Sequence, residues 1–345
     1  MRVLLTGSAG FIGGRIARTL QADGVEVLGV DALLPAAHPV DAPLPEGTLR
    51  LDVRDPVGWE DALRGVDVVC HQAALVGAGV TVDDLPDYAA INDLGTATLL
   101  AAMHRAGVHR LVLASSMVVY GEGRYACPDH GDQPTPARQL SDLEAGVFDH
   151  RCPVCSGPLG WALVDEGAPV DPRSSYAASK VAQEHYARAW ARQAGGRVVA
   201  LRYHNVYGPG MPRDTPYSGV AAMFRSSIER GEAPRVFEDG GQMRDFVHVD
   251  DVARANLHAV KAVLDAGSGE VGTYNVCSGH PVGIGDVARL LAGAAGPAPV
   301  VTGEFRLGDV RHVVASPERA RAGLGFRAKI GPEEGLPAFA TAPLR

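Results

Sequence analysis

Blocks of positive charge are missing from this sequence. Its 345 residues carry 32 Lys and Arg against 40 Asp and Glu, a formal net charge of −8, and no segment is rich in basic residues. Proteins that bind nucleic acid or anionic membranes concentrate basic residues on one face. We therefore expect no nucleic-acid partner and no membrane partner, although a few local arginines can still hold a small anionic ligand.

Long apolar segments are missing as well. The most apolar later stretch, residues 65–82, contains Asp, His and Gln, which excludes a membrane-spanning helix there. The opening "MRVLLTGSAGFIGG" predicts a buried strand and a glycine turn rather than a secretory signal. Cysteine is scarce, and five is an odd number, which suits a reducing compartment better than a disulfide scaffold. We expect a cytoplasmic protein.

Short β-rich segments alternate with helical patterns in the first half of the chain. Examples of the helical patterns are residues 13–24 and 92–107, and a longer helix begins near residue 176. This βαβ order predicts a parallel, doubly wound α/β sheet with right-handed crossovers. The predicted strands are residues 2–7, 26–31, 47–53, 67–73, 110–116 and 197–208.

A glycine turn follows the first predicted strand. In "TGSAGFIG", Gly7, Gly10 and Gly13 let the backbone turn into a helix and approach a pyrophosphate, which the helix N-terminus attracts. A tight strand-to-helix turn without a ligand is the alternative. Asp31 ends the second strand, where a carboxylate accepts hydrogen bonds from ribose hydroxyls and repels a 2′-phosphate. Together these residues predict a bound NAD rather than NADP.

A tyrosine and a lysine stand four residues apart at the start of a later helix. Tyr176 and Lys180 therefore share one helix face, and a plain surface pair is the alternative reading. The ammonium, helped by an oxidised nicotinamide, is expected to lower the tyrosine pKa from ~10 by roughly 1–3 units. Ser116 ends the fifth strand, at the sheet edge where ligands bind, and Ser115 competes for the same role.

These residues and several longer motifs resemble the extended short-chain dehydrogenase/reductase family, in its sugar-nucleotide epimerase branch. The motifs are "TGSAGFIGG", "LDVRD", "HQAA", "NDLGT", "SSMVVYG", "YAASK", "LRYHNVYGPG" and "GGQMRDFVHVDD". The resemblance implies that Tyr176 is the acid/base, that Lys180 orients the nicotinamide ribose and that Ser116 binds the sugar hydroxyl. It implies further cofactor contacts at Phe11, Ile12, Asp52, Val53, Ala73, Ala74 and Asn92.

The same resemblance implies a nucleoside-diphosphate sugar as substrate. Arg244 and Arg306 match the positions that hold the diphosphate, where guanidinium groups suit phosphate oxygens. A surface salt bridge is the alternative for each arginine. Asn205 falls where a side-chain amide meets the substrate. Two positions depart from the family pattern, His204 for Phe and Gln72 for Leu.

The resemblance also divides the chain. We expect a Rossmann NAD-binding domain over residues 1–205 and a smaller α/β substrate lobe over 206–345, with 246–280 returning to the first domain. Residues 121–172 form a proline-rich, zinc-knuckle-like insertion with little periodicity. A homodimer through the helix that begins at Tyr176 and a neighbouring helix is implied as well.

The insertion holds two short cysteine and histidine pairs. Cys127-x2-His130 and Cys152-x2-Cys155 predict a structural zinc, because four protein ligands leave no open position for water. A Cys152–Cys155 disulfide and ordinary reduced thiols are the alternatives. The other cysteine and ligand candidates are His150 and Asp129, which are alternative ligands, and Cys70 and Cys277, which are expected in the core.

The expected activity is NAD-dependent C4 epimerisation of a nucleoside-diphosphate sugar through a 4-keto intermediate. Met117 and Val118 replace the Asp–Glu pair of the 4,6-dehydratases and cannot move a proton, which argues against dehydration. The insertion and the motifs "TPYSGVAAMF" and "RLGDVRHVVASPERAR" look like those of bacterial dTDP-L-rhamnose 4-epimerases. The alternatives are a 4-ketoreductase, a UDP-glucuronate decarboxylase or a non-catalytic NAD-binding scaffold.

Overall fold

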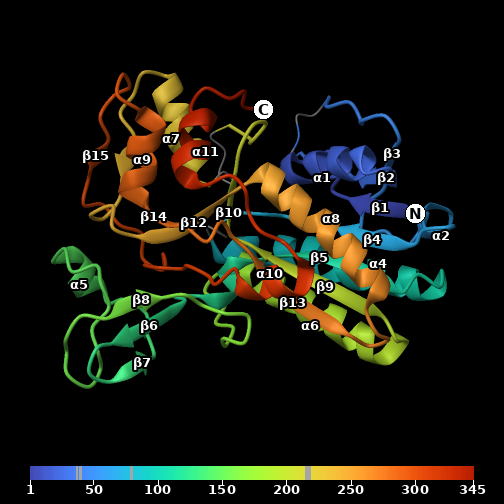
Figure 1. Ribbon diagram of the computed structural model, residues 1–345, viewed down its shortest axis with the longest axis horizontal. Helices are drawn as coiled ribbons and strands as arrows, with labels where there is room; N and C mark the ends of the chain where they lie inside the picture. The colour runs from blue at the N-terminus through green and yellow to red at the C-terminus, as the bar shows by residue number, and fades with distance from the viewer. Residues whose placement is uncertain (36–37, 39–40, 78–80, 214–218) are drawn as a thin grey trace.

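A seven-stranded parallel sheet forms the largest part of the protein (Figure 1). The computed structural model describes residues 1–35, 38, 41–77, 81–213 and 219–345, so part of the "TPYSGVAAMF" motif lies outside the described residues. The strand order β13-β9-β5-β4-β1-β2-β3 is that of a doubly wound Rossmann sheet, as predicted. Its strands are β1 (Arg2–Thr6), β2 (Glu26–Asp31), β3 (Thr48–Arg50), β4 (Val68–His71), β5 (Arg110–Ser116), β9 (Arg197–Tyr203) and β13 (Val271–Val276).

Helices cover both faces of this sheet. The residues of β1 alternate between two cores: Val3 and Leu5 pack with α1 and α8, whereas Leu4 packs with α4 and α6. Both faces of the central strands are therefore buried, which explains their nearly continuous apolar sequence. The bounds of these helices are α1 (Phe11–Ala22), α4 (Gly95–Arg105), α6 (Ser175–Ala194) and α8 (Val249–Asp265).

Short elements connect the central strands on the α4 side. The π-helix η2 continues directly into α4, and the 3-10 helix η3 follows β5 without a gap. These connections lie at the carboxyl edge of the sheet, where ligands bind in this fold. The bounds are α2 (Trp59–Ala62), η1 (Val82–Asp84), α3 (Leu85–Tyr88), η2 (Ala89–Leu94) and η3 (Met117–Tyr120).

A smaller lobe is built mainly from the second half of the chain. β10 pairs in parallel with β12, and β12 pairs antiparallel with β14. Tyr207, Phe246 and Leu336 lie in a separate apolar core beneath α7, α9 and α11. The remaining bounds are β10 (Asn205–Tyr207), α7 (Val220–Glu229), β11 (Arg235–Val236), β12 (Met243–His248), β14 (Pro281–Gly283), α9 (Ile284–Ala292), β15 (Val300–Val301), α10 (Glu318–Leu324) and α11 (Pro332–Phe339).

The insertion has a sheet of its own. β6 (Arg124–Cys127) pairs antiparallel with β7 (Gly131–Gln133) and with β8 (Gly160–Ala162), and α5 (Leu140–Glu144) follows β7. In Figure 1 this green unit extends below the smaller lobe, at the left of the molecule. The insertion shows little periodicity in its sequence because its strands are only three or four residues long, and not because it is an irregular loop.

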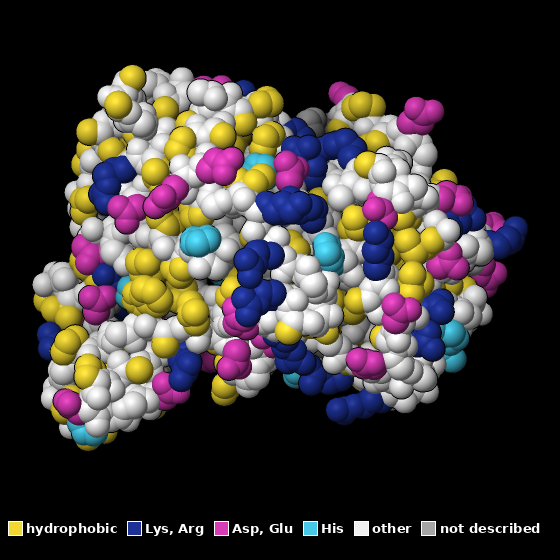
Figure 2. Space-filling model, in the orientation of Figure 1, with side chains coloured by type: hydrophobic (Ala, Val, Ile, Leu, Met, Phe, Trp, Pro, Cys, Tyr) yellow, Lys and Arg dark blue, Asp and Glu magenta, His cyan; other side chains and the backbone are white. Residues whose placement is uncertain are grey.

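The distribution of charged side chains on the surface (Figure 2) agrees with the sequence, in which no segment is rich in basic residues. Basic and acidic side chains are interspersed on the face shown in Figure 2, so no broad area of one charge appears there. Within the described ranges, no helix combines the length and apolar character that a membrane crossing requires.

Candidate active site

Sterics at the turn after β1 require glycine. Gly7 has a φ of +68°, and a Cβ there would lie 2.8 Å from the backbone nitrogen of Ala73. A Cβ at Gly13 would lie 2.0 Å from the carbonyl oxygen of Gly7. Gly10 caps α1 without any side-chain hydrogen bond, so the first N–H groups of the helix, beginning at Phe11, face the turn. This arrangement suits the pyrophosphate that the sequence predicts.

Asp31 is a buried acid at the end of β2. Its carboxylate accepts hydrogen bonds from the backbone nitrogens of Ala9, at 3.0 Å, and Leu33, at 2.9 Å. These bonds tie the glycine turn to the next strand end. Each carboxylate oxygen can accept a further bond, so the predicted contact with ribose hydroxyls is compatible with these two.

The other predicted cofactor residues lie along the same edge. Asp52 forms a two-pronged ion pair with Arg54, whose hydrogen bonds lower the pKa of the Asp52 carboxyl. Ala73 and Ala74 follow β4, and Val53 is buried against Gly95 of α4.

Asn92 joins two segments by hydrogen bonds, near the sheet edge where the cofactor is expected to bind. Its Oδ1 accepts from the backbone nitrogen of Leu75 at 2.8 Å, and its Nδ2 donates to Ser179 Oγ of α6 at 2.8 Å. Asn92 lies in η2, and the π-helical turn leaves it facing both partners. This geometry is compatible with the predicted role of Asn92 beside the cofactor, which stays a prediction.

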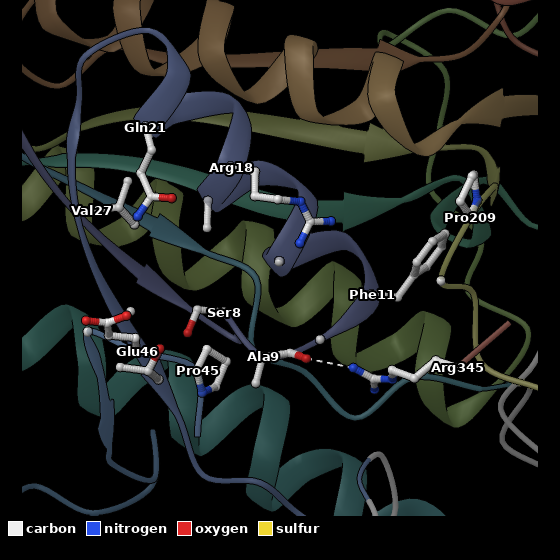
Figure 3. A pocket seen from close by; sticks show the side chains of 17 residues that line it. Ser8, Ala9, Phe11, Arg18, Gln21, Val27, Pro45, Glu46, Pro209 and Arg345 are labelled. Atoms are coloured by element: carbon white, nitrogen blue, oxygen red, sulfur yellow. Dashed lines mark hydrogen bonds between the residues drawn. The ribbon is translucent and has the colours of Figure 1, made fainter. Parts of the chain in front are cut away.

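An arginine far along the chain also reaches the glycine turn. Arg345 Nη1 donates to the carbonyl oxygen of Ala9 at 2.6 Å (Figure 3). The cavity beside it measures about 400 Å³ and is lined by Phe11, Arg18 and Glu46, among others. No local pattern could have found Arg345, because its partner lies 336 residues away.

Ser116, Tyr176 and Lys180 converge at the carboxyl end of β5. Ser174 caps α6 by accepting from the nitrogen of Ala177 at 3.1 Å, which starts the helix beside the strand. The nitrogen of the buried Lys180 side chain lies 5.8 Å from the centre of the Tyr176 ring. The Ser116 side chain lies close enough to the Tyr176 hydroxyl to lower its pKa. The structure thus brings the three predicted catalytic side chains together.

The pKa of Tyr176 is not lowered in the polypeptide by itself, so the expected lowering with an oxidised nicotinamide stays a prediction. Burial raises the pKa of Tyr176 to about 12, and the nearby Ser116 side chain offsets only part of this increase. Burial also lowers the pKa of Lys180 to about 7, against the attraction of Glu184 and Asp93. The spacing of the two residues indicates a neighbouring charge but not the loss of solvent around both groups.

The choice between the two serines follows from their partners. Ser115 points to the opposite face of β5, where its hydroxyl donates to Glu184 at 2.5 Å. Glu184 is held in turn by two hydrogen bonds from Arg202, at 2.9 and 2.7 Å. The Ser115 hydroxyl is therefore engaged in a buried structural network, whereas Ser116 faces Tyr176.

The predicted substrate residues lie between β10, β12 and the segment 304–313. The Arg244 guanidinium donates to the backbone carbonyls of Met243 (2.9 Å), Arg311 (2.8 Å) and Val310 (2.6 Å). These three carbonyls hold the guanidinium, and no salt bridge to a carboxylate within 4.0 Å is found for it among the described residues. Asn205 begins β10, and its Oδ1 is buried without a hydrogen-bond partner in the described ranges.

Arg306 and Arg244 approach a common carboxyl group. Burial raises the pKa of Asp309, while Arg306, Arg244 and Arg138 act to lower it. Arg306 also stacks on Phe237, 5.1 Å from the ring centre. Arg138 belongs to the insertion and was not predicted, because nothing in a proline-rich loop marks one arginine among its neighbours.

The two departures from the family pattern differ in their contacts, because both ring nitrogens of His204 are buried without a hydrogen-bond partner in the described ranges, whereas Gln72 is hydrogen-bonded. Burial lowers the pKa of His204 to about 3, so its imidazole is neutral. Gln72 accepts from the Tyr203 hydroxyl at 3.0 Å and donates to Asn256 at 3.1 Å. Met117 and Val118 lie in η3, where an acid pair would be needed for dehydration.

The cysteines and histidine of the insertion meet as the sequence predicts. The ligand atoms of Cys127, His130, Cys152 and Cys155 all lie within 4.8 Å of one another. Cys127 Sγ is 3.4 Å from His130 Nδ1 and 3.8 Å from Cys155 Sγ. All five cysteines are free thiols, so the alternative Cys152–Cys155 disulfide is not formed. Cys70 and Cys277 are buried, as expected.

The alternative ligands lie apart from this cluster. His150 Nε2 is 3.3 Å from Glu122 Oε2, and its ring packs edge-on against Tyr125. The group of possible metal ligands in the described ranges contains neither His150 nor Asp129. The geometry therefore favours His130 as the fourth member.

The fold and this site define a nicotinamide-dependent sugar-nucleotide enzyme class, and comparison with known proteins agrees. The model of the NAD dependent epimerase/dehydratase family matches residues 3–142 and 162–277, and the chain belongs to this family. The residues between the two matches, 143–161, include Cys152 and Cys155 of the insertion.

Individual relatives are similar over nearly their whole length. The dTDP-L-rhamnose 4-epimerase of Burkholderia thailandensis is 33% identical over 347 residues, covering 97% of this chain and 93% of that protein. The UDP-glucose 4-epimerase of Mycolicibacterium smegmatis is 32% identical over 351 residues, covering 97% and 96%. The structure of the Thermus thermophilus UDP-glucose 4-epimerase in complex with NAD superposes with a TM-score of 0.76 at 33% identity, covering 99% and 98%.

Proposed function

We propose that this protein is an NAD-dependent 4-epimerase of nucleoside-diphosphate sugars. The observation that carries the proposal is the convergence of Ser116, Tyr176 and Lys180 at the carboxyl end of β5, beside a glycine turn that fits a dinucleotide. The 4-epimerases among its relatives, one acting on a dTDP-sugar and others on UDP-glucose, support the same reaction.

Tyr176 is proposed to move the proton of the sugar C4 hydroxyl. Its burial keeps the phenol protonated in the polypeptide, so a nearby positive charge is needed to favour the phenolate. Lys180, fixed by a 3.0 Å hydrogen bond to the carbonyl oxygen of Ala114, is one such charge. When bound, NAD supplies the hydride acceptor at C4 and a second positive charge at its oxidised ring. Ser116 holds the hydroxyl that Tyr176 deprotonates.

Epimerisation requires the 4-keto sugar to present its opposite face before reduction. The nucleoside diphosphate has to stay anchored while the sugar turns, because its binding energy keeps the reacting carbon in the site. Arg244 and Arg306, which both border Asp309, are proposed to hold the diphosphate, with Asn205 at the sugar. Met117 and Val118 offer no proton donor for dehydration.

We also propose that the insertion holds a structural Zn²⁺. Three thiolates and an imidazole form a closed tetrahedral set, and adjacent ligand atoms around zinc lie about 3.5–4 Å apart. The cluster distances of 3.4, 3.7 and 3.8 Å agree with this spacing. Elemental analysis of the purified protein is expected to give about one zinc per chain, with less than about a tenth of that in Cys155→Ser. Absence of zinc in the unchanged protein would exclude the site.

Two further proposals concern the setting of the enzyme. Reduced thiols throughout the chain suit the cytoplasm.

The α6 helix exposes Tyr186, and the neighbouring η2 exposes Leu94, an arrangement that suits a homodimer through these helices. Sedimentation analysis of the purified protein at several concentrations would distinguish a dimer from a monomer.

A proton NMR time course tests the reaction. Purified protein without added cofactor is mixed separately with dTDP-L-rhamnose, UDP-glucose and UDP-glucuronate. Appearance of a C4 epimer from one of them identifies a self-contained redox cycle and its substrate. Stoichiometric oxidation of NADH or NADPH with a 4-keto sugar nucleotide, and no epimer from any substrate, would instead identify a 4-ketoreductase and reject the proposal.

A further inference from the structure

The stem of the insertion packs directly on the chain segment beside Arg244. Gly123 has a φ of +74°, and a Cβ there would lie 2.9 Å from the carbonyl oxygen of His312. Only glycine permits this approach of the two backbones. Residues 310–313, called the anchor segment below, are therefore in close contact with the start of the insertion.

Two buried side chains of the insertion bind the backbone of the anchor segment. The Tyr125 hydroxyl accepts from the nitrogen of His312 at 2.9 Å and donates to Glu122 Oε2 at 3.1 Å. The same Glu122 oxygen accepts from the nitrogen of Arg311 at 2.8 Å. The N–H groups of Arg311 and His312 are thus bound by Glu122 and Tyr125, which are themselves hydrogen-bonded to each other.

The carbonyl groups of the anchor segment hold Arg244. The guanidinium donates to the carbonyls of Val310 and Arg311, the residues whose neighbouring N–H groups bind Glu122 and Tyr125. Glu122 also lies close enough to Arg244 to favour its charge, against the effect of burial. The orientation of the guanidinium is therefore set by peptide groups that the insertion fixes from their other side.

A second set of contacts joins the insertion to the smaller lobe through side chains. The buried guanidinium of Arg311 pairs with Asp149 of the insertion at 2.7 Å and with Glu238 of the lobe at 2.9 Å. Arg138 pairs with the same glutamate at 2.7 Å and donates to the carbonyl oxygen of Asp309 at 2.5 Å. The two pairs with Glu238 are buried, whereas Asp149 is half-exposed, and together these contacts resist sliding of the insertion over the anchor segment.

The cysteine and histidine cluster is attached to the same strand as Tyr125. Cys127 follows it by two residues in β6, so both side chains lie on one face of the strand. Tyr125, Cys127, Cys152 and Leu159 form one small apolar core. A metal ion at the cluster would hold this core together, because the unit buries few other apolar side chains.

We propose that the insertion positions the nucleotide anchor: Tyr125 and Glu122 fix the anchor segment so that Arg244 keeps the orientation that binds a nucleoside diphosphate, and the metal cluster keeps β6 in place. This inference rests on the proposed function, in which Arg244 binds the diphosphate. Tyr125 is a positioning residue, since it acts through backbone groups and not on the substrate. Its loss weakens nucleotide binding and leaves the chemical step intact.

Tyr125→Phe in the full-length protein tests this proposal. The change leaves the buried N–H of His312 without its acceptor and removes one of the hydrogen bonds to Glu122 Oε2, so the Kd for dTDP or UDP, measured by calorimetry, is expected to rise about tenfold. The KM for the sugar nucleotide should rise in parallel, while kcat and the amount of bound NAD change less than about twofold. Arg124→Ala is the matched control on the same strand, because the exposed Arg124 side chain pairs with Asp132 of the insertion itself.

Metal removal by a chelator tests the link to the cluster. The Kd should rise in the unchanged protein by a factor similar to that of Tyr125→Phe, and the two changes together should give less than the product of their effects. Multiplicative effects would show that the metal does not act through Tyr125. If the Phe variant does not fold, Glu122→Gln takes its place, with an expected rise in Kd of about threefold.

The outcomes separate this inference from the proposed function. An unchanged Kd in Tyr125→Phe, with normal epimerisation, rejects the positioning role alone. A raised Kd in a protein that epimerises none of the sugar nucleotides rejects the proposed function and retains the positioning role. Failure of the unchanged protein to bind either dTDP or UDP rejects both.

Discussion

Replacement of Asp93 by Asn should move the alkaline limit of activity to lower pH. Asp93 stabilises the ammonium form of Lys180, whose pKa is lowered by burial to about 7. Asp93 is itself partly buried, and its Oδ1 has no hydrogen-bond partner in the described ranges, so the change disturbs few contacts. Loss of the carboxylate removes an attraction that raises the lysine pKa, and the ammonium is then lost at lower pH.

The magnitude follows from the starting value. If the Lys180 pKa falls from about 7 by about one unit, the charged fraction at pH 8 falls about tenfold, and at pH 6 only about twofold. Because the ammonium favours the Tyr176 phenolate, kcat should follow the charged fraction. The Asp93→Asn variant is therefore expected to lose most of its activity above pH 7 and little below pH 6.

The assay is kcat against pH from 5.5 to 9 at saturating sugar nucleotide, with bound NAD quantified at each pH. Asp87→Asn, an exposed acid in the neighbouring α3, is the control and should leave the profile unchanged. An Asp93→Asn profile that overlays that of the unchanged protein would refute the reasoning, as would a uniform loss of kcat at every pH.

Three further changes test the catalytic site, the cofactor turn and the fold. Tyr176→Phe should lower kcat by a factor of about 10²–10⁴ with bound NAD retained, and a loss below about tenfold would exclude Tyr176 as the proton-moving group. Gly13→Ala places a Cβ 2.0 Å from the carbonyl oxygen of Gly7, so the purified variant should contain little NAD; full occupancy would contradict the glycine-turn assignment. Glu184→Gln leaves the buried Arg202 without its carboxylate partner and should lower the free energy of unfolding at pH 7 by about 3–5 kcal/mol in urea titrations. The folded state lowers the pKa of Glu184, so this difference should shrink as the pH falls through that pKa; a difference independent of pH would mean that the carboxylate charge is not its source.

Local sequence determined much of the fold. The order of β-rich and helical segments predicts the parallel sheet, because a strand buried on both faces has a nearly continuous apolar sequence of its own. The glycines of the first turn and the Tyr176–Lys180 spacing are also local, since a turn and a helix face are set by residues close in sequence. The two ligand pairs of the insertion predicted the Cys127, His130, Cys152 and Cys155 cluster for the same reason.

The pKa values of the catalytic pair were decided by tertiary structure. Solvent is excluded from Tyr176 and Lys180 by elements distant in sequence, and this burial raises the pKa of the tyrosine and lowers that of the lysine. Tertiary structure also decided which of the two serines is available to the active site. Ser115 lies on the face of β5 that meets Glu184 and is hydrogen-bonded there, which leaves Ser116 for the site. A sequence pattern gives the residue types at a site but not the dielectric environment around them.

The setting of the nucleotide anchor was also decided by tertiary structure. The sequence predicted Arg244 as a substrate residue but not the contacts around it. Most of these contacts join segments that are far apart along the chain: the backbone acceptors of the Arg244 guanidinium, the approach of Gly123 to His312 and the pair of Arg138 with Glu238. Such contacts leave no period or motif in the sequence, because each is specified only once the sheet, the lobe and the insertion have packed together. Local sequence thus determined the chemical groups of this protein, and long-range packing decided their orientation and their charge.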